Sequence, residues 1–295
     1  MEYVNFGGTG RTVSRLGFGG AVAGLKNYLA RYDPANSKDR DTVQRAIQTA
    51  LDLGVTYFDT APGYGDGQSE LIYGESLSSA ARDRIFIATK LKLDYSQGGV
   101  HLSVDSVRRS VEDSLKRLRT DYLDLIQLHG TSWRPEQEHD ILKSGGILEE
   151  MIKLKEEKLV LHTGFTSEDN NKAVYDFIDD CRFDMYMICY NFLFQHCYDP
   201  NRPFGSMLEA EKKNMGIVAM RASTSGIFQK WMRIVDPENR RDYTPDLIRF
   251  VFSNPLVDVV LVGMRSEQEV RMNAAICDDK ACRPDLLKDL FSYYV

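Results

Sequence analysis

Residues 103–129 read SVDSVRRSVEDSLKRLRTDYLDLIQLH and hold one complete helix-and-strand unit. Within Ser103–Leu118 the apolar residues recur at helical spacing on one face, and Ser103 stands in the N-cap position. Tyr122–His129 follows as a nearly continuous apolar run, which is typical of a parallel strand buried on both faces. The stretch therefore predicts an α/β fold built on parallel strands.

The same alternation of short apolar runs and helical segments continues in both directions along the chain. The predicted strands are Leu16–Gly20, Thr56–Thr60, Ile85–Lys90, Tyr122–His129, Val160–Thr166, Met185–Asn191, Gly216–Arg221 and Val257–Gly263. The other predicted helices are Asp39–Asp52, Gly146–Glu157, Glu168–Asp180, Phe204–Asn214, Asp246–Ser253, Glu267–Ile276 and Pro284–Tyr294. Eight strands interleaved with helices predict a closed (β/α)₈ barrel, the TIM barrel.

Two further features shape this prediction. Tyr3–Ser14 is centred on glycines at residues 7, 8 and 10 and predicts a β-hairpin that covers the bottom of the barrel. A doubly wound sheet is the competing fold, but its Gly-rich first turn is incomplete, because Val22 stands where the third glycine after Gly17 and Gly19 belongs. We therefore expect residues 1–295 to form a single barrel domain.

The composition is that of an ordinary globular protein, with 43% hydrophobic residues, 27% charged residues and a net charge of −6. Basic residues are scattered, so we expect no nucleic-acid partner, and no apolar run approaches the roughly 18 residues that span a membrane. The five cysteines form no CxxC pair, which argues against a disulfide framework and a metal site. With no signal-peptide pattern at the N-terminus, we expect a cytoplasmic protein with a small-molecule partner. The oligomeric state stays open.

Reactive side chains gather at the ends of three successive predicted strands. Asp59 ends the second strand and Tyr64 follows in the next turn, Lys90 ends the third strand, and His129 ends the fourth. Barrel enzymes carry their reactive groups at the C-terminal ends of their strands. The sequence therefore predicts that these four residues meet at one mouth of the barrel.

Each of these residue types has a role in reducing a carbonyl group. A tyrosine can donate the proton, and a neighbouring lysine ammonium lowers its ordinary pKa of about 10. A carboxylate keeps the lysine charged, and a histidine can polarise the carbonyl. Taken singly, Asp59 could cap a turn, Lys90 could be solvated, and His129 could be a core residue. Their order, on consecutive strands, favours the catalytic interpretation.

The segment Gly54-Val55-Thr56-Tyr57-Phe58-Asp59-Thr60-Ala61-Pro62-Gly63-Tyr64-Gly65 resembles the signature of the aldo-keto reductase family. The resemblance continues through residues 88–90, 110–118 and 121–129, and covers essentially the whole chain. It implies that Tyr64 is the general acid and base, that Asp59 and Lys90 tune it, and that His129 positions the carbonyl. It also implies hydride transfer between a nicotinamide cofactor and a carbonyl or alcohol.

The resemblance also implies a set of cofactor contacts around the barrel mouth. Those nearest the nicotinamide would be Gly19, Gly20, Ala21, Asp59, Thr166, Ser167, Met187 and Met220. Thr166 and Ser167 replace the usual Ser-Asn pair, Met187 stands where a Gln is usual, and Met220 stands where an aromatic residue often stacks. The seventh-strand loop would contribute Arg221, Ala222, Ser223 and Ser225. For Arg221, a pyrophosphate contact and a surface ion pair both stay open.

The adenosine end of the cofactor is expected at Gly263, Arg265, Glu269 and Asn273. Arg265 suits the 2′-phosphate of NADP, whereas Glu269 would repel a phosphate and suits the free ribose hydroxyls of NAD. The family habit favours NADP, with NAD as the alternative.

Substrate specificity is expected from the loops above the barrel. They carry the aromatic residues Tyr28, Tyr32, Tyr95, Trp133, Phe192, Phe194 and Trp231, which either line the substrate site or cover the core. Trp133, four residues after His129, is the predicted substrate contact beside Tyr64 and His129. Two other functions stay open: a cofactor-binding regulatory subunit with little turnover, and a lyase or isomerase that uses Lys90 as a Schiff base.

Overall fold

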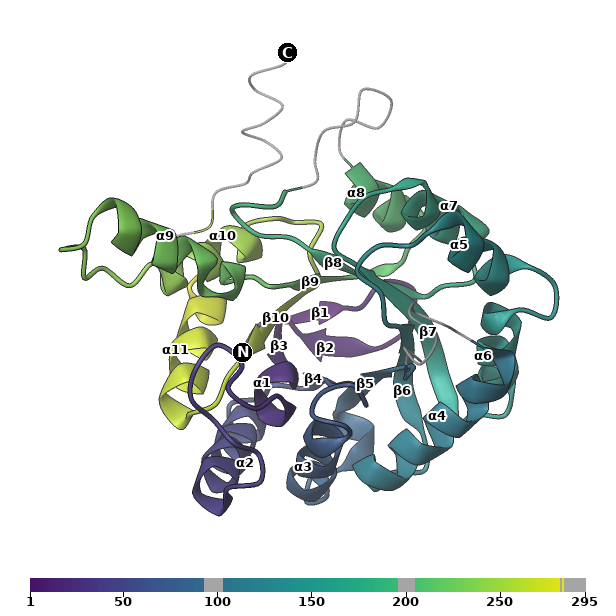
Figure 1. Ribbon diagram of the computed structural model, residues 1–295, viewed down its shortest axis with the longest axis horizontal. Helices are drawn as coiled ribbons and strands as arrows, with labels where there is room; N and C mark the ends of the chain where they lie inside the picture. Colours follow the sequence, from purple (N-terminus) through teal and green to yellow (C-terminus); the bar gives the residue numbers. More distant parts are fainter. Residues whose placement is uncertain (93–102, 196–204, 282, 284–295) are drawn as a thin grey trace, which may run out of the picture.

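The computed structural model describes residues 1–92, 103–195, 205–281 and 283. Eight parallel strands close a barrel in the order β10-β3-β4-β5-β6-β7-β8-β9 (Figure 1). They are β3 (Leu16–Gly19), β4 (Tyr57–Asp59), β5 (Phe86–Lys90), β6 (Leu123–Leu128), β7 (Val160–Ser167), β8 (Met185–Cys189), β9 (Gly216–Met220) and β10 (Val259–Gly263). The predicted TIM barrel is confirmed, with strands that differ by a few residues at their ends from those predicted.

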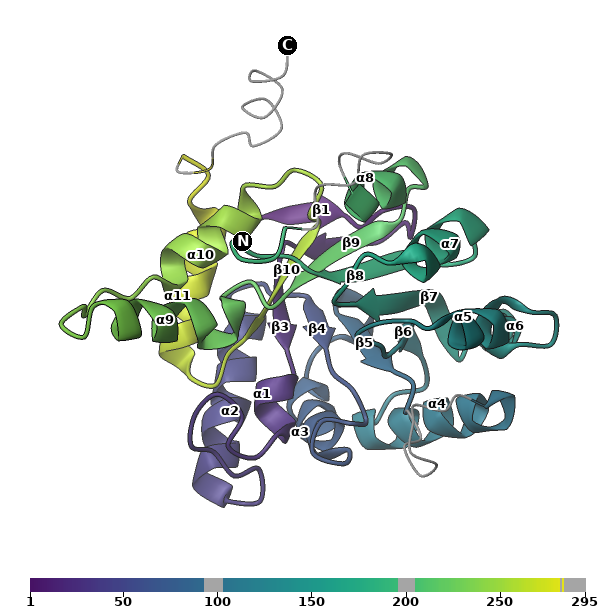
Figure 2. The same cartoon turned by 45° about the horizontal axis from the view of Figure 1, so that its top comes forward.

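Helices surround the barrel on its outside, as Figures 1 and 2 show. They are α2 (Ser37–Asp52), α3 (Gln68–Leu77), α4 (Val104–Leu118), α6 (Ile147–Glu156), α7 (Lys172–Asp180), α8 (Gly205–Lys212), α10 (Thr244–Phe252) and α11 (Glu267–Asp278). Each apolar stripe faces the strands: in α4, Val107, Val111 and Leu118 are buried. The helix predicted at Pro284–Tyr294 lies outside the described residues.

The capping residues of two helices bear on the predicted helix starts. Ser103 occupies the N-cap position of α4, but its side chain makes no capping hydrogen bond. The helix predicted from Glu168 begins at Lys172 instead, because the Asn171 side chain accepts a hydrogen bond from the Val174 amide and caps α7. Glu168 is thereby left in the loop at the barrel mouth.

Several short elements lie in segments where no helix was predicted. They are α1 (Ala21–Gly24), η1 (Arg82–Arg84), α5 (Pro135–Leu142), η2 (Thr224–Gly226) and α9 (Ile227–Val235). The full helix α3 was also missed. It contains Gly74, where an added Cβ would lie 2.3 Å from the Arg117 carbonyl oxygen. The glycine that lowers helix propensity is therefore what allows α3 to pack closely on α4.

The N-terminal hairpin closes the bottom of the barrel, as predicted. Its strands β1 (Tyr3–Asn5) and β2 (Thr12–Ser14) pair antiparallel. Phe6, in the connecting turn, is fully buried and meets the rings of Tyr57 and Phe86 edge-on at 5.6 and 5.4 Å between centroids. These two residues begin β4 and β5. Phe6 thus fills the N-terminal end of the barrel and leaves the C-terminal end open for a ligand.

Candidate active site

The four predicted catalytic residues line one pocket at the C-terminal ends of the strands. Asp59 ends β4 and Lys90 ends β5, while His129 directly follows β6. Tyr64 lies in the turn between β4 and α3, where its carbonyl accepts a hydrogen bond from the Ser69 amide at 3.2 Å. Gly24 of α1 packs so closely on this turn that an added Cβ would lie 2.1 Å from the Tyr64 carbonyl oxygen. The backbone therefore fixes where the phenol stands.

Asp59 and Lys90 form a buried ion pair under the pocket. Lys90 Nζ lies 2.5 Å from Asp59 Oδ1 and donates a second hydrogen bond to the Thr60 carbonyl at 2.8 Å. Burial disfavours the ammonium, but Asp59 and Tyr64 outweigh it, so the pKa of Lys90 is raised above its ordinary value. Lys90 is therefore a permanent positive charge near neutral pH.

Tyr64 stands next to this charge, with Lys90 Nζ 5.0 Å from the centre of its ring. Burial raises the pKa of Tyr64, and the charge and hydrogen bonding of Lys90 offset this rise only in part. We expected a net lowering from the sequence, and the direction is the opposite because desolvation is the larger effect. The phenol is thus protonated throughout the neutral range.

His129 faces Tyr64 edge-on, with 5.7 Å between ring centroids and an interplanar angle of 88°. Burial, helped by the charge of Lys90, lowers the pKa of His129 to about 3. The imidazole is therefore neutral near pH 7 and can donate a hydrogen bond from one ring nitrogen to a bound oxygen. Tyr64 and His129 together present two donors to the same part of the pocket.

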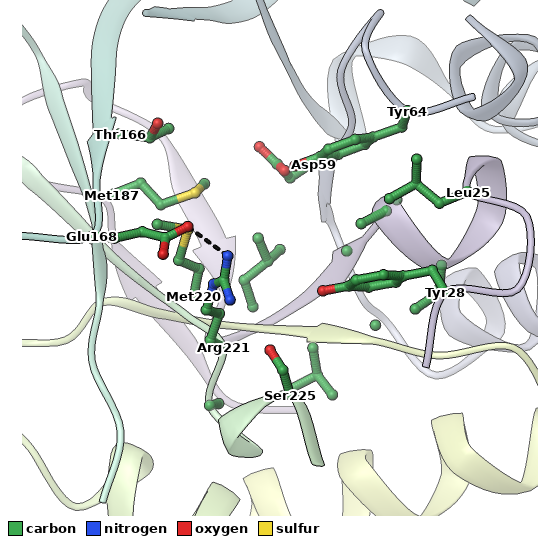
Figure 3. Close-up of a pocket in the computed structure, with 18 of the residues that line it drawn as sticks. Leu25, Tyr28, Asp59, Tyr64, Thr166, Glu168, Met187, Met220, Arg221 and Ser225 are labelled. Carbon is green, nitrogen blue, oxygen red and sulfur yellow. Dashed lines mark hydrogen bonds and ion pairs between the residues drawn. The ribbon is translucent and has the colours of Figure 1, made fainter. Parts of the chain in front are cut away.

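The pocket holds about 330 Å³ and has two unlike walls. Figure 3 shows Leu25 and Tyr28 on one side, across from Glu168 and Arg221. Arg221 Nη2 lies 2.5 Å from Glu168 Oε1, so the ion-pair alternative for Arg221 is realised while the residue still lines the pocket. One wall is thus mainly apolar and the other is charged.

Most of the predicted cofactor residues also line this pocket. They are Gly19, Gly20, Ala21, Asp59, Thr166, Met187, Met220, Arg221, Ala222, Ser223, Ser225 and Gly263. Ser167, Arg265, Glu269 and Asn273 do not line it. The predicted site therefore divides into residues that line this pocket and residues that lie outside its lining.

The hydroxyls at the end of β7 serve the fold. Thr166 Oγ1 donates to the Gly130 carbonyl at 2.7 Å and accepts from the Gly130 amide at 3.0 Å. Ser167 is fully buried, and its hydroxyl bonds the Thr131 carbonyl and the Asp169 carboxylate. The bonds to Gly130 and Thr131 tie β7 to the loop after β6. These hydroxyls thus already bond within the protein, and Ser167 is not among the residues that line the pocket.

Arg265 and Glu269 are also used within the protein. Arg265 donates to the carbonyls of Val22 at 2.9 Å and Tyr28 at 2.6 Å, and its guanidinium lies 4.6 Å from the centre of the Tyr32 ring. Glu269 accepts from the Arg265 amide at 2.6 Å and forms a capping box with Ser266 at the start of α11. Arg265 therefore anchors the loop that carries Tyr28 into the pocket.

Trp133, the predicted substrate contact, belongs to the core instead. It is 3% exposed, donates from Nε1 to the Thr166 carbonyl at 2.9 Å and packs edge-on against Phe177. Its indole lies over Gly130, and Trp133 is not among the residues that line the pocket. Tyr28 is the aromatic loop residue that lines the pocket, whereas Tyr32 is buried beside Arg265, and Phe192, Phe194 and Trp231 are exposed elsewhere. Tyr95 lies outside the described residues.

Sequence reasoning missed polar residues of the site, among them Gln127 and Glu168. Gln127 is fully buried on β6, and its Nε2 donates to Asp59 Oδ2 at 2.8 Å. Its position two residues before His129 places it on the same strand face, which is a usable sequence indication. Glu168 was assigned to a helix, which concealed its place at the end of β7.

Two kinds of feature are absent from the described residues. These residues contain no helix long and apolar enough to cross a membrane, and no group of three His, Cys, Asp or Glu residues arranged to hold a metal ion.

Comparison with known proteins identifies the family of this chain. Residues 15–247 match the model of the aldo/keto reductase family, and the chain belongs to that family. It is 39% identical over 132 residues to the aldo-keto reductase YhdN of Bacillus subtilis, covering 44% of this chain and 38% of that protein. It is 33% identical over 151 residues to an NADH-specific methylglyoxal reductase of Escherichia coli, covering 46% and 44% respectively. These alignments thus span less than half of each curated relative.

Solved structures support the fold over nearly the whole chain. The holo form of the aldo-keto reductase AKR11C1 from Bacillus halodurans superposes with a TM-score of 0.74 at 21% identity, covering 95% of this chain and 92% of that one. An aldo/keto reductase from Klebsiella pneumoniae in complex with NADP and acetate gives a TM-score of 0.69 at 22% identity, covering 94% and 90%.

Proposed function

We propose that the protein is an NAD(P)-dependent oxidoreductase that transfers a hydride between a nicotinamide cofactor and the carbonyl or alcohol of a small aldehyde, ketone or sugar. One observation carries this proposal: Tyr64 and His129 face one pocket, and beneath them Lys90 is held charged by Asp59. An acid, a polarising donor and a fixed positive charge are what carbonyl reduction needs.

The pocket offers small residues and hydrogen-bond donors that suit the nicotinamide and pyrophosphate parts of a dinucleotide. Gly19 and Gly263 pair across β3 and β10, and with Ala21 and Ala222 they give a floor of small residues that a ligand can approach closely. Ser223, Ser225 and Arg221 offer donors suited to a pyrophosphate. NADP is the first choice, because one similar structure holds NADP. NAD is the alternative, because one relative is NADH-specific.

The protein's own residues divide the remaining work. A bound nicotinamide supplies or accepts the hydride. His129, being neutral, donates a hydrogen bond to the substrate oxygen and orients it. Tyr64 transfers the proton of its hydroxyl to that oxygen during reduction, and the nearby charge of Lys90 stabilises the phenolate that remains. Alcohol oxidation runs the same steps in reverse and needs Tyr64 deprotonated, so it should be favoured by rising pH.

A Schiff-base reaction at Lys90 fits the site poorly. Such a lysine must lose its proton to act as a nucleophile. Here the pKa of Lys90 is raised, and Nζ is already bonded to Asp59 and to the Thr60 carbonyl.

The test is a fluorescence titration with NADPH and NADH, followed by a panel of aldehydes, ketones and sugars. Tyr64→Phe should bind cofactor normally and lose most of the reductase activity. Tyr3→Phe is the matched control, because that hydroxyl bonds the Gly54 carbonyl at the far end of the barrel. Reduction by Tyr64→Phe at the original rate would refute the assignment, and tight cofactor binding without any turnover would indicate a regulatory subunit instead.

A further inference from the structure

Gln127 is a polar residue in the interior of the barrel. It lies on β6 opposite Lys90 of β5, and opposite Gly164 of β7 on its other side. Its neighbour at the same face, Leu125, belongs to the apolar cluster that fills the barrel. An amide therefore stands where the strand pattern favours an apolar side chain.

The Gln127 amide completes the hydrogen bonding of Asp59. Lys90 Nζ binds Oδ1 at 2.5 Å, and Gln127 Nε2 binds Oδ2 at 2.8 Å. The same Nε2 lies 3.4 Å from the Thr89 carbonyl. Because each carboxylate oxygen has its own donor, the carboxylate cannot rotate about its bond without losing one of them.

The carbonyl oxygen of the same amide makes no comparable hydrogen bond among the described residues. Gln127 Oε1 is buried and has no hydrogen-bond partner among the described residues. A buried acceptor without a partner costs free energy, which an apolar residue would avoid. The reverse orientation of the amide would put Oε1 against the carboxylate, so the bond to Asp59 decides which way the amide points.

We propose that Gln127 is a positioning residue for the reaction proposed above: it holds the Asp59 carboxylate so that Oδ1 stays on Lys90 and Lys90 stays beside Tyr64. This inference rests on the proposed function. The charged and titratable groups that face the carboxylate are Lys90 from β5, Tyr64 from the turn before α3, Tyr57 from β4 and Tyr73 from α3. His129 faces Lys90 from the end of β6. Gln127 supplies a neutral donor to the one anion among them.

Gln127→Glu and Gln127→Leu test this role through the pH dependence of kcat/KM. Glutamate keeps the shape of glutamine, and when protonated it can still donate to Asp59. Once ionised it repels Asp59 and cannot donate. The Gln127→Glu enzyme should therefore match the wild type at low pH and fall away from it as the pH rises through the pKa of the new carboxyl. Gln127→Leu, which lacks the donor at every pH, should lose about tenfold to a hundredfold in kcat/KM throughout.

Gln48→Glu is the matched control. Gln48 also donates to a carboxylate, Asp52 Oδ1 at 2.9 Å, but on the exposed surface of α2. Its pH profile should coincide with that of the wild type. A constant ratio of Gln127→Glu to wild type across the pH range would overturn the proposal, since a merely structural residue gives no new titration.

A second readout does not depend on turnover. NMR of isotopically labelled tyrosine, with Tyr64 assigned by its absence in Tyr64→Phe, reports the Tyr64 titration directly. It should shift to higher pH in Gln127→Leu, because Asp59 then acts on Tyr64 with less of its charge compensated. If the wild type turns over no substrate, the proposed function fails while this measurement still decides the role of Gln127. An unchanged titration would refute that role. If Gln127→Leu does not fold, the isosteric Gln127→Glu carries the test.

Discussion

Replacing Lys90 by methionine removes the positive charge on which the site is built. Methionine has a similar length and no charge, so the main change is the loss of a 2.5 Å ion pair whose two side chains are each only 2% exposed. Asp59 keeps its hydrogen bond from Gln127, but its negative charge stays buried without a counterion. The variant therefore measures mainly the cost of leaving that carboxylate unpaired, together with the lost hydrogen bond to the Thr60 carbonyl.

The expected loss in unfolding free energy is about 3–5 kcal/mol, the usual cost of removing one partner from a buried ion pair. Lys92, two residues further on, provides the control. Its pair with Asp66 has an Nζ–Oδ1 distance of 3.2 Å, but the two side chains are 62% and 89% exposed. Lys92→Met should therefore cost about 0–1 kcal/mol. The double variant Asp59→Asn with Lys90→Met should recover part of the loss, because it leaves no buried charge.

Urea unfolding at neutral pH measures all of these variants through their midpoints and slopes. The pKa of Lys90 is raised in the folded protein, so its stabilising contribution is complete below its ordinary pKa of 10.5 and is lost as the pH rises through the folded value. If the unfolding free energies of Lys90→Met and Lys92→Met differ by less than about 1 kcal/mol, which is the scale of an exposed pair, the buried ion pair does not stabilise the fold as its geometry implies.

Three further changes test other parts of the structure. Phe6→Ala should cost about 3–5 kcal/mol in urea unfolding and leave KM unchanged, because the ring fills the barrel end away from the pocket. Trp133→Phe should cost about 1 kcal/mol through the lost bond to Thr166 and leave KM unchanged; a raised KM would restore Trp133 as a substrate contact. The pKa of His129 is lowered in the folded protein, so this one group should make the unfolding free energy of the wild type fall by about 1.4 kcal/mol per pH unit from pH 6.5 towards 3. His129→Asn should lack this contribution to the slope.

The barrel and the reactive residues could be predicted because both follow from short-range pattern. Apolar runs buried on both faces mark the strands, and the reactive side chains stand at the strand ends. The helix α3 could not be predicted, because Gly74 looks unfavourable until the close approach of α4 is known. The direction of the Tyr64 pKa shift depends on the balance between burial and Lys90, which no sequence pattern gives.

Three of the predicted cofactor residues that do not line the pocket have one feature in common. Ser167, Arg265 and Glu269 have the right chemistry to bind a cofactor, but each already forms hydrogen bonds within the protein. Arg265 instead fixes the loop that carries Tyr28 into the pocket, and so affects the pocket through Tyr28. Gln127 shows the reverse. Its residue type gave no reason to place it in the site, but its hydrogen bond to Asp59 gives one. The role of a polar residue near a strand end, in ligand binding or in the fold, therefore depends on its hydrogen-bond partners within the protein. By that criterion Tyr64 and His129, which face the pocket, are better founded as ligand contacts than Arg265.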